Sequence, residues 1–242
     1  MSRTHKRFFL VFPLIYSIWL CAAQSIAQEY PNKISFQNIM RNQDIALGEV
    51  EALWQDYEGF MWLGGRNALL RYDGYDFLSV KVADAKDPSK MAPVNQVVDL
   101  FEDSRKDLWV ATRSGLLKYD RKAEVLRSLQ QENGKPLAIF NDTVNAVTEA
   151  PSGEILAGGF NGLSIIDPKT LNATTIANVP SDPSSLPNNV VHAIFKDKDG
   201  AIWLGTDVGV SRLDWASKKI TTYIPDPTNP ASQTDNAVWR IE

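Results

Sequence analysis

Hydrophobic and polar positions recur along this chain with a constant period of 47 residues. Each copy is centred on a bulky apolar residue, at Trp62, Trp109, Leu156 and Trp203. Each copy also opens on a valine, at Val50, Val97, Val144 and Val191, with a fifth at Val238. Repeats of this length that consist of short strands predict stacked sheets, because one repeat cannot bury its own apolar faces.

Each copy divides into four predicted strands separated by turn residues. In the first copy these strands are residues 50–54, 61–63, 69–73 and 77–80. Aspartate begins and glycine ends the first turn at 56–59 and again at 197–200, which favours a hairpin. The second strand is apolar on both faces, whereas the fourth is more polar. This gradient predicts an order from a buried inner strand to an exposed outer strand.

Four graded strands per repeat predict an all-β fold, a β-propeller with four-stranded blades of 47 residues. The repeats span about 48–94, 95–141, 142–188 and 189–235, and residues 236–242 begin a fifth. We therefore expect four complete blades of an incomplete ring. Residues 33–39 are expected to supply the outer strand of a last blade that lies outside this sequence. A small closed ring of four blades is the alternative.

Residues 1–27 have the order of a secretory signal peptide. Arg3, Lys6 and Arg7 precede an apolar run over residues 8–23, and Ala27 is the predicted cleavage position. An uncleaved anchor is the alternative, but the run is short for a membrane span and Pro13 interrupts it. The propeller segment is therefore expected to be residues 28–242, in the periplasm or elsewhere outside the cytoplasm.

Composition narrows the possible functions of the mature chain. Removing Arg3, Lys6 and Arg7, and no acidic residue, changes the formal net charge from −4 to −7. An acidic chain lacks the basic surface that phosphate backbones require, so nucleic acid is not an expected partner. The only cysteine, Cys21, lies in the predicted signal, so disulfides and thiolate metal sites are not expected.

The turn and the strands around it carry a more specific motif. Residues 197–206 read Asp-Lys-Asp-Gly-Ala-Ile-Trp-Leu-Gly-Thr, and residues 103–116 repeat the pattern around Trp109. This motif resembles the two-component regulator propeller repeat. The resemblance implies a periplasmic sensor propeller, followed by a membrane span and a histidine kinase, hybrid kinase or diguanylate cyclase. The third copy departs from the motif, with Ala150 in place of the aspartate and Leu156 in place of the tryptophan.

No catalytic constellation is recognisable, and no cofactor or metal is expected. After residue 27 the only histidine is His192, and its equivalents in the other copies include Glu51 and Asn145, so we interpret it as a local packing or hydrogen-bonding choice. Residues 197–200 resemble the start of a calcium loop but lack the later ligands. Trp62, Trp109 and Trp203 are interpreted as packing residues and not as sugar-stacking platforms.

The turns between the second and third strands of each copy vary while their flanks stay constant. They carry Arg66, Arg113, Phe160 and Asp207, which we predict to lie on one face as the ligand site. Two arginines suit a carboxylate, which favours a small molecule or a short acidic oligosaccharide. The chain is thus expected to be a ligand-sensing module whose output domain, and any membrane attachment, lie outside this sequence.

Two other functions remain open at this point. One is a secreted propeller lyase, and the other is a purely structural propeller that binds other proteins. Self-association through the uncovered side of the fourth blade is a further expectation.

Overall fold

A computed structural model describes residues 47–84, 87, 89–129, 143–226, 228–229 and 237–241. The predicted signal, the segment 33–39 and the loop at 131–141 lie outside the described residues. Contacts divide the chain into two units, residues 1–43 and 44–242, and every described residue belongs to the second unit.

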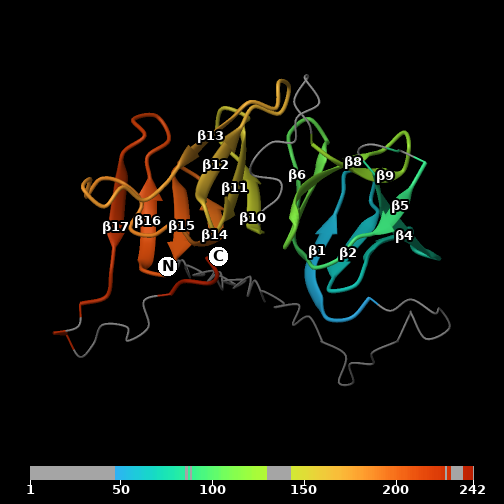
Figure 1. Cartoon of the computed structure of the whole chain (residues 1–242), viewed down its shortest axis with the longest axis horizontal. Coiled ribbons are helices and arrows are strands. Elements are labelled where there is room, and N and C mark those ends of the chain that lie inside the picture. Colours follow the sequence, from blue (N-terminus) through green and yellow to red (C-terminus); the bar gives the residue numbers. More distant parts are fainter. Residues whose placement is uncertain are drawn as a thin grey trace, which may run out of the picture. The chain divides into compact units, whose positions relative to one another are not determined.

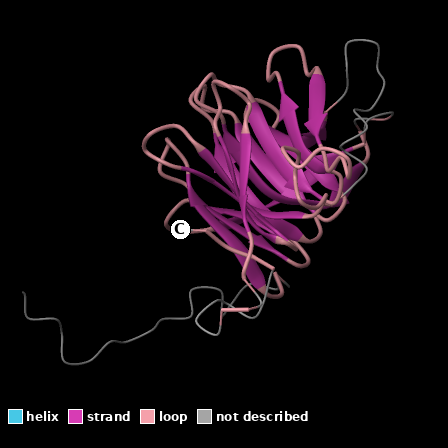
Figure 2. Ribbon diagram, turned by 90° about the vertical axis from the view of Figure 1, so that its left-hand side faces the viewer, coloured by secondary structure: helices cyan, strands magenta, loops and turns pink. Residues whose placement is uncertain are grey.

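Within this described part the regular elements are seventeen strands, and none is a helix able to span a membrane (Figure 2). Sixteen strands form four blades, each a meander of four antiparallel strands (Figure 1). Blade 1 is β1 (Val50–Gln55), β2 (Met61–Gly65), β3 (Leu69–Tyr72) and β4 (Phe77–Ala83). Blade 2 is β6 (Val97–Glu102), β7 (Leu108–Thr112), β8 (Gly115–Asp120) and β9 (Val125–Ser128). Blade 3 is β10 (Val144–Glu149), β11 (Ile155–Gly159), β12 (Gly162–Ile166) and β13 (Ala173–Ile176). Blade 4 is β14 (Val191–Lys196), β15 (Ile202–Thr206), β16 (Gly209–Leu213) and β17 (Ile220–Tyr223).

The outer edges of blades 1 and 2 are joined, which the sequence did not predict. Strand β4 runs to Ala83, beyond the expected end at Val80, and its last residues pair in parallel with β9. The short strand β5 (Met91–Pro93) pairs with the same end of β4. Blades 1 and 2 therefore form one nine-stranded sheet, whereas blades 3 and 4 are separate four-stranded sheets.

The turn aspartate and the tryptophan of each motif form a hydrogen-bonded pair. Asp56 Oδ1 accepts the backbone N–H groups of Glu58 and Phe60, and its Oδ2 accepts Trp62 Nε1–H at 2.9 Å. The same pairs join Asp103 to Trp109 at 3.0 Å and Asp197 to Trp203 at 2.9 Å. The bond from the Trp203 indole lowers the pKa of Asp197.

This pairing explains the departures in the third copy as one change. Ala150 and Leu156 replace both partners together, so neither an indole donor nor a carboxylate acceptor is left unpaired. Trp62, Trp109 and Leu156 are fully buried, whereas Trp203 is only partly buried.

Consecutive blades approach closely at the small residues near the end of each blade's second strand. A side-chain Cβ at Gly64 would lie 2.4 Å from Val97 Cγ1, and one at Gly158 would lie 2.6 Å from Val191 Cγ1. Gly205 has the same relation to Val238, whose backbone N–H donates to the Thr206 carbonyl at 2.9 Å. Residues 237–241 thus lie against blade 4 in the way that the first strand of blade 2 lies against blade 1 and the first strand of blade 4 lies against blade 3.

Candidate functional site

The turns between the second and third strands of the blades lie beside the loops that connect one blade to the next. Gln96 N–H donates to the Arg66 carbonyl at 2.8 Å, and Arg113 N–H donates to the Gln96 carbonyl at 3.1 Å. Gly162 N–H likewise donates to the Asn189 carbonyl at 2.7 Å. We call the surface formed by these turns (66–67, 113–114, 160–161 and 207–208) and loops the loop face.

The four predicted site residues lie on this face but contact different groups. Arg66 forms an exposed ion pair with Glu49 at 3.4 Å, which is a weak interaction because both side chains are solvated. Arg113 Nη1 donates to Asn145 Oδ1 at 3.2 Å, and Asp207 Oδ1 lies 2.6 Å from His192 Nε2. The Phe160 side chain is 47% exposed. Among the described residues, no hydrogen bond or ion pair joins two of the four.

A second group of residues, which sequence reasoning did not assign to the site, links Arg113 and Asp207 to the inner strands. These are Asn145, His192 and Trp239, each of which directly follows the valine that opens its copy of the repeat. Asn145 Nδ2 donates to the Val191 carbonyl at 3.0 Å, so it connects blades 3 and 4. The His192 ring lies 3.9 Å from that of Trp239, which is 67% exposed. The sequence signal that could have assigned these residues to the site is that the residue type varies at this one position of the repeat.

The loop between blades 3 and 4 forms one wall of a groove on the loop face. Asn178 Nδ2 donates to the Leu186 carbonyl at 2.6 Å, and Val179 N–H donates to Ser185 Oγ at 2.9 Å. Leu186 is fully buried and anchors the loop. The groove has a volume of about 260 Å³ and extends to Val208, next to Asp207. It is mostly apolar, because three prolines and Val179 line it.

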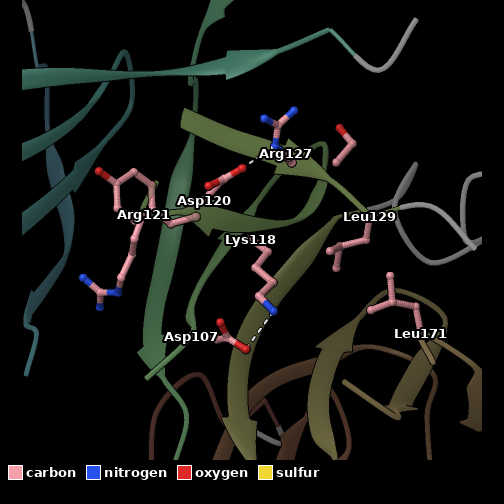
Figure 3. A pocket seen from close by; sticks show the side chains of 9 residues that line it. Asp107, Lys118, Asp120, Arg121, Arg127, Leu129 and Leu171 are labelled. Atoms are coloured by element: carbon pink, nitrogen blue, oxygen red, sulfur yellow. Dashed lines mark hydrogen bonds and ion pairs between the residues drawn. The ribbon is translucent and has the colours of Figure 1, made fainter. Parts of the chain in front are cut away.

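A larger cavity of about 440 Å³ lies between the outer parts of blades 2 and 3 (Figure 3). Two ion pairs line it, Lys118 Nζ–Asp107 Oδ2 at 2.7 Å and Arg127 Nε–Asp120 Oδ2 at 2.8 Å. The bond from Arg127 lowers the pKa of Asp120. Leu129 and Leu171 form the apolar side. Sequence reasoning missed this cavity because it depends on how two blades meet.

A carboxyl group also bridges blades 2 and 3 near their inner strands. Asp99 Oδ2 accepts Val147 N–H at 2.8 Å, and its Oδ1 accepts Leu100 N–H at 2.9 Å. The equivalent positions in the other three complete copies are alanines. Desolvation raises the pKa of Asp99 to about 6, against 3.8 for an ordinary aspartate. In the described part of the chain, no cluster of acidic, histidine or cysteine side chains is arranged to hold a metal ion.

Comparison with protein families identifies a known repeat that contains the motif. The profile described as "Two component regulator propeller" matches residues 92–114 and 185–208. Two segments of the chain thus match two-component regulator propeller repeats. The two matches contain β6–β7 of blade 2 and β14–β15 of blade 4, including the aspartate–tryptophan pairs of both blades. The resemblance stated from the sequence is therefore confirmed.

Solved structures share the fold. The extracellular domain of a putative hybrid two-component system from Bacteroides thetaiotaomicron aligns with 73% of this chain at 20% identity and a TM-score of 0.60. Virginiamycin B lyase from Staphylococcus aureus aligns with 78% at 15% identity and a TM-score of 0.54. This chain spans 25% of the first protein and 59% of the second. The likeness confirms the predicted propeller blades. Comparison with curated proteins gave no match.

Proposed function

We propose that this chain is the ligand-sensing propeller of a signal-transduction protein that acts outside the cytoplasm. The observation that carries the proposal is the match of regulator propeller repeats in the same register of blades 2 and 4. The signal-like order of residues 1–27 supports export. The output domain, a kinase or cyclase, belongs to sequence outside this chain.

The loop face is the proposed ligand surface. Rigid strands hold it, and its turns differ between blades in charge and size, which is the usual arrangement of a binding surface on a fixed scaffold. Arg113 can donate to a carboxylate, while the exposed ring of Trp239 offers an apolar surface beside Asp207 and His192. A short oligosaccharide with an acidic group suits these residues, because a sugar ring has an apolar face and many hydroxyls.

A thermal-shift screen of the chain against acidic and neutral oligosaccharides tests this proposal. A ligand should raise the melting temperature of the wild type, and the rise should be smaller for Arg113→Ala and Asp207→Asn. Arg66→Ala should have a weaker effect, because the Arg66 side chain is largely solvated and a charged contact there gains little. Lys198→Ala, in the exposed β14–β15 turn, is the matched control and should respond as the wild type does. The proposed surface is wrong if no oligosaccharide shifts the wild type, or if all variants respond equally.

A secreted lyase is a second candidate, because the structure gives His192 a carboxylate partner on the loop face. A histidine held by an aspartate can act as a general base. However, the His192 side chain is only 8% exposed, and Asp207 and Trp239 occupy its Nε2 and one ring face. A proton-transfer role would therefore require Asp207 or Trp239 to move. Incubation of each stabilising ligand with the chain, followed by mass spectrometry, separates binding from cleavage.

A further inference from the structure

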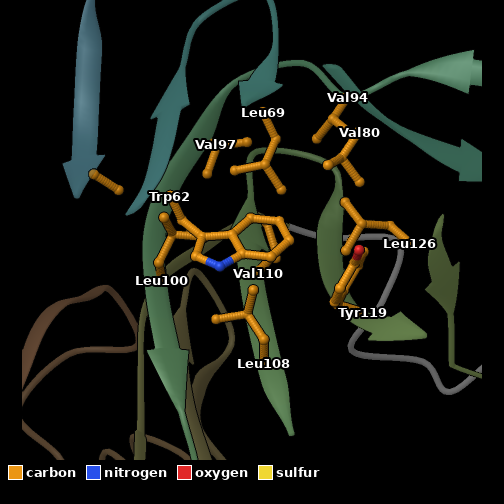
Figure 4. Close-up of a cluster of buried hydrophobic side chains, with 11 residues drawn as sticks. Trp62, Leu69, Val80, Val94, Val97, Leu100, Leu108, Val110, Tyr119 and Leu126 are labelled. Carbon is orange, nitrogen blue, oxygen red and sulfur yellow. The ribbon is translucent and has the colours of Figure 1, made fainter. Parts of the chain in front are cut away.

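At the place between blades 1 and 2 that corresponds to the cavity between blades 2 and 3, side chains bridge the two blades. There Arg71 of blade 1 crosses to blade 2, where it donates to Tyr119 Oη at 3.1 Å and to Glu124 Oε1 at 2.9 Å. Trp62 and Tyr119 pack edge to face with ring centroids 4.7 Å apart, and Leu126 fills the space beside them (Figure 4). That junction is closed by polar bonds over an apolar core.

The same positions one repeat later cannot close in this way. Lys118 follows Arg71 by 47 residues, but Ile166 and Leu171 stand where Tyr119 and Glu124 would be. Glu124 and Leu171 both have a positive φ, of 54° and 57°, so the turn is alike at these two positions while the side chains differ. Leu171 cannot accept a hydrogen bond, and Lys118 pairs instead with Asp107 of its own blade. The gap stays open with a charged wall on blade 2 and an apolar wall that includes Leu171.

The charges in this cavity balance. Arg121 lines it, but its guanidinium is directed to Asp56, Glu58 and Glu102 on the far side of blade 2. Two cations, Lys118 and Arg127, then face the two carboxylates of Asp107 and Asp120. A ligand with a net charge would leave one of these groups uncompensated, whereas a zwitterion would not.

Arg127 has bonding capacity in reserve. Among the described residues only Asp120 bonds its guanidinium, through Nε, and Figure 3 shows the terminal nitrogens directed away from that carboxylate. Two terminal N–H groups of arginine match the two oxygens of a carboxylate. Leu129 and Leu171 lie across from these charged groups and can contact an apolar side chain. The volume of about 440 Å³ lies within the range of small-molecule sites.

We infer that this cavity binds a small zwitterion with an apolar side chain, an amino acid of the leucine type. The carboxylate would bond the terminal nitrogens of Arg127, the ammonium would bond Asp120 or Asp107, and the side chain would contact Leu129 and Leu171. This site is separate from the loop face and does not depend on an oligosaccharide binding there.

Isothermal titration calorimetry of the full chain tests the inference with three probes. L-leucine carries both charges, isocaproate carries the carboxylate alone, and isoamylamine carries the ammonium alone. L-leucine is expected to bind with a dissociation constant in the micromolar to millimolar range. Each half-ligand should bind more weakly by a factor of about ten or more, since each lacks one charged hydrogen bond. Equal binding of L-leucine and either half-ligand would overturn the zwitterion assignment.

Two variants and one control locate the site. Arg127→Gln should weaken L-leucine binding about tenfold or more. Leu171→Glu should abolish L-leucine binding. The new glutamate would stand where Glu124 stands at the preceding junction and would offer Lys118 a partner across the gap. Arg212→Gln, at the position of Lys118 in blade 4, should leave binding unchanged. Urea melts show that each variant is folded. Absence of binding to the wild type, or undiminished binding by both folded cavity variants, overturns the inference.

Discussion

Blades 1 and 2 meet through polar groups that cross the gap at several levels, whereas blades 2 and 3 leave a cavity at the outer level. At the first junction Arg121 bonds Asp56, Glu58 and Glu102, and β4 pairs with β9. At the second junction the crossing bonds lie further in, at Asp99 and at Glu149, which accepts Ser104 N–H at 3.0 Å. One backbone repeat therefore closes or opens a gap according to a few side chains.

One hydrogen bond between blades is common to both junctions. Glu102 Oε2 accepts Tyr57 N–H at 3.1 Å, and Glu149 makes the equivalent bond one repeat later. The last residue of the inner strand in blades 2 and 3 thus holds the first turn of the preceding blade. Blade 4 has Lys196 at this position, and there Trp215 Nε1 bonds Ser152 instead. The two junctions therefore share the glutamate bond and differ in other contacts, such as those of Arg121 at the first junction and Asp99 at the second.

The largest expected effect tests whether the two junctions have equally packed cores. Trp62→Ala and Trp109→Ala should each cost about 3–5 kcal/mol, because both rings are fully buried. Trp203→Ala should cost clearly less, because Trp203 is only partly buried. Free energies of unfolding from urea melts measure all three. A smaller loss for Trp109→Ala than for Trp62→Ala would mean that the cavity loosens the core beside it.

A second comparison separates the arginines of the two junctions. Arg121→Ala should cost about 3 kcal/mol, because it removes the nearest cation from the buried carboxylates of Asp56 and Glu102. Arg127→Ala should cost less than about 1 kcal/mol, because its pair with Asp120 is partly solvated. Equal losses in urea melts would contradict the assignment of Arg121 as the bridge between blades.

The third prediction concerns pH and is specific to the junction of blades 2 and 3. Because the folded pKa of Asp99 is about 6 and the ordinary value is 3.8, the folded state retains the proton over that interval. The contribution of Asp99 to stability is full below pH 4 and is lost as the pH rises through about 6, a change of about 3 kcal/mol. Asp99→Asn keeps an acceptor for Val147 N–H but cannot titrate.

The measurement is the difference in unfolding free energy between the wild type and Asp99→Asn at pH 4 and pH 7. Carboxylates with lowered pKa, such as Asp120, act in the opposite direction but cancel in this difference. The wild type should lose stability relative to the variant as the pH rises. A difference that does not change with pH would show that the Asp99 carboxyl is not desolvated.

Much of the fold could be predicted from the sequence because its signals are local. The strands follow from apolar runs, and the turn at Asp197 follows from a side chain that bonds backbone groups two and four residues later. The pairing of this aspartate with Trp203 was within reach, since Ala150 and Leu156 change together in the third copy. The candidate site was predicted less completely. Arg113 and Asp207 were named, but their partners Asn145 and His192 were not assigned to the site.

The sequence by itself determined the repeat, the four-stranded blades, the turn chemistry and the resemblance to regulator propeller repeats, because each depends on residues within one 47-residue copy. Only the tertiary structure decided which residues meet between copies. Tyr57 and Glu102 are 45 residues apart, and Asp56 and Arg121 are 65 residues apart. Such contacts depend on how one twisted sheet packs against the next, which periodicity does not specify. The open cavity beside Leu171 and the desolvated carboxyl of Asp99 are consequences of that packing.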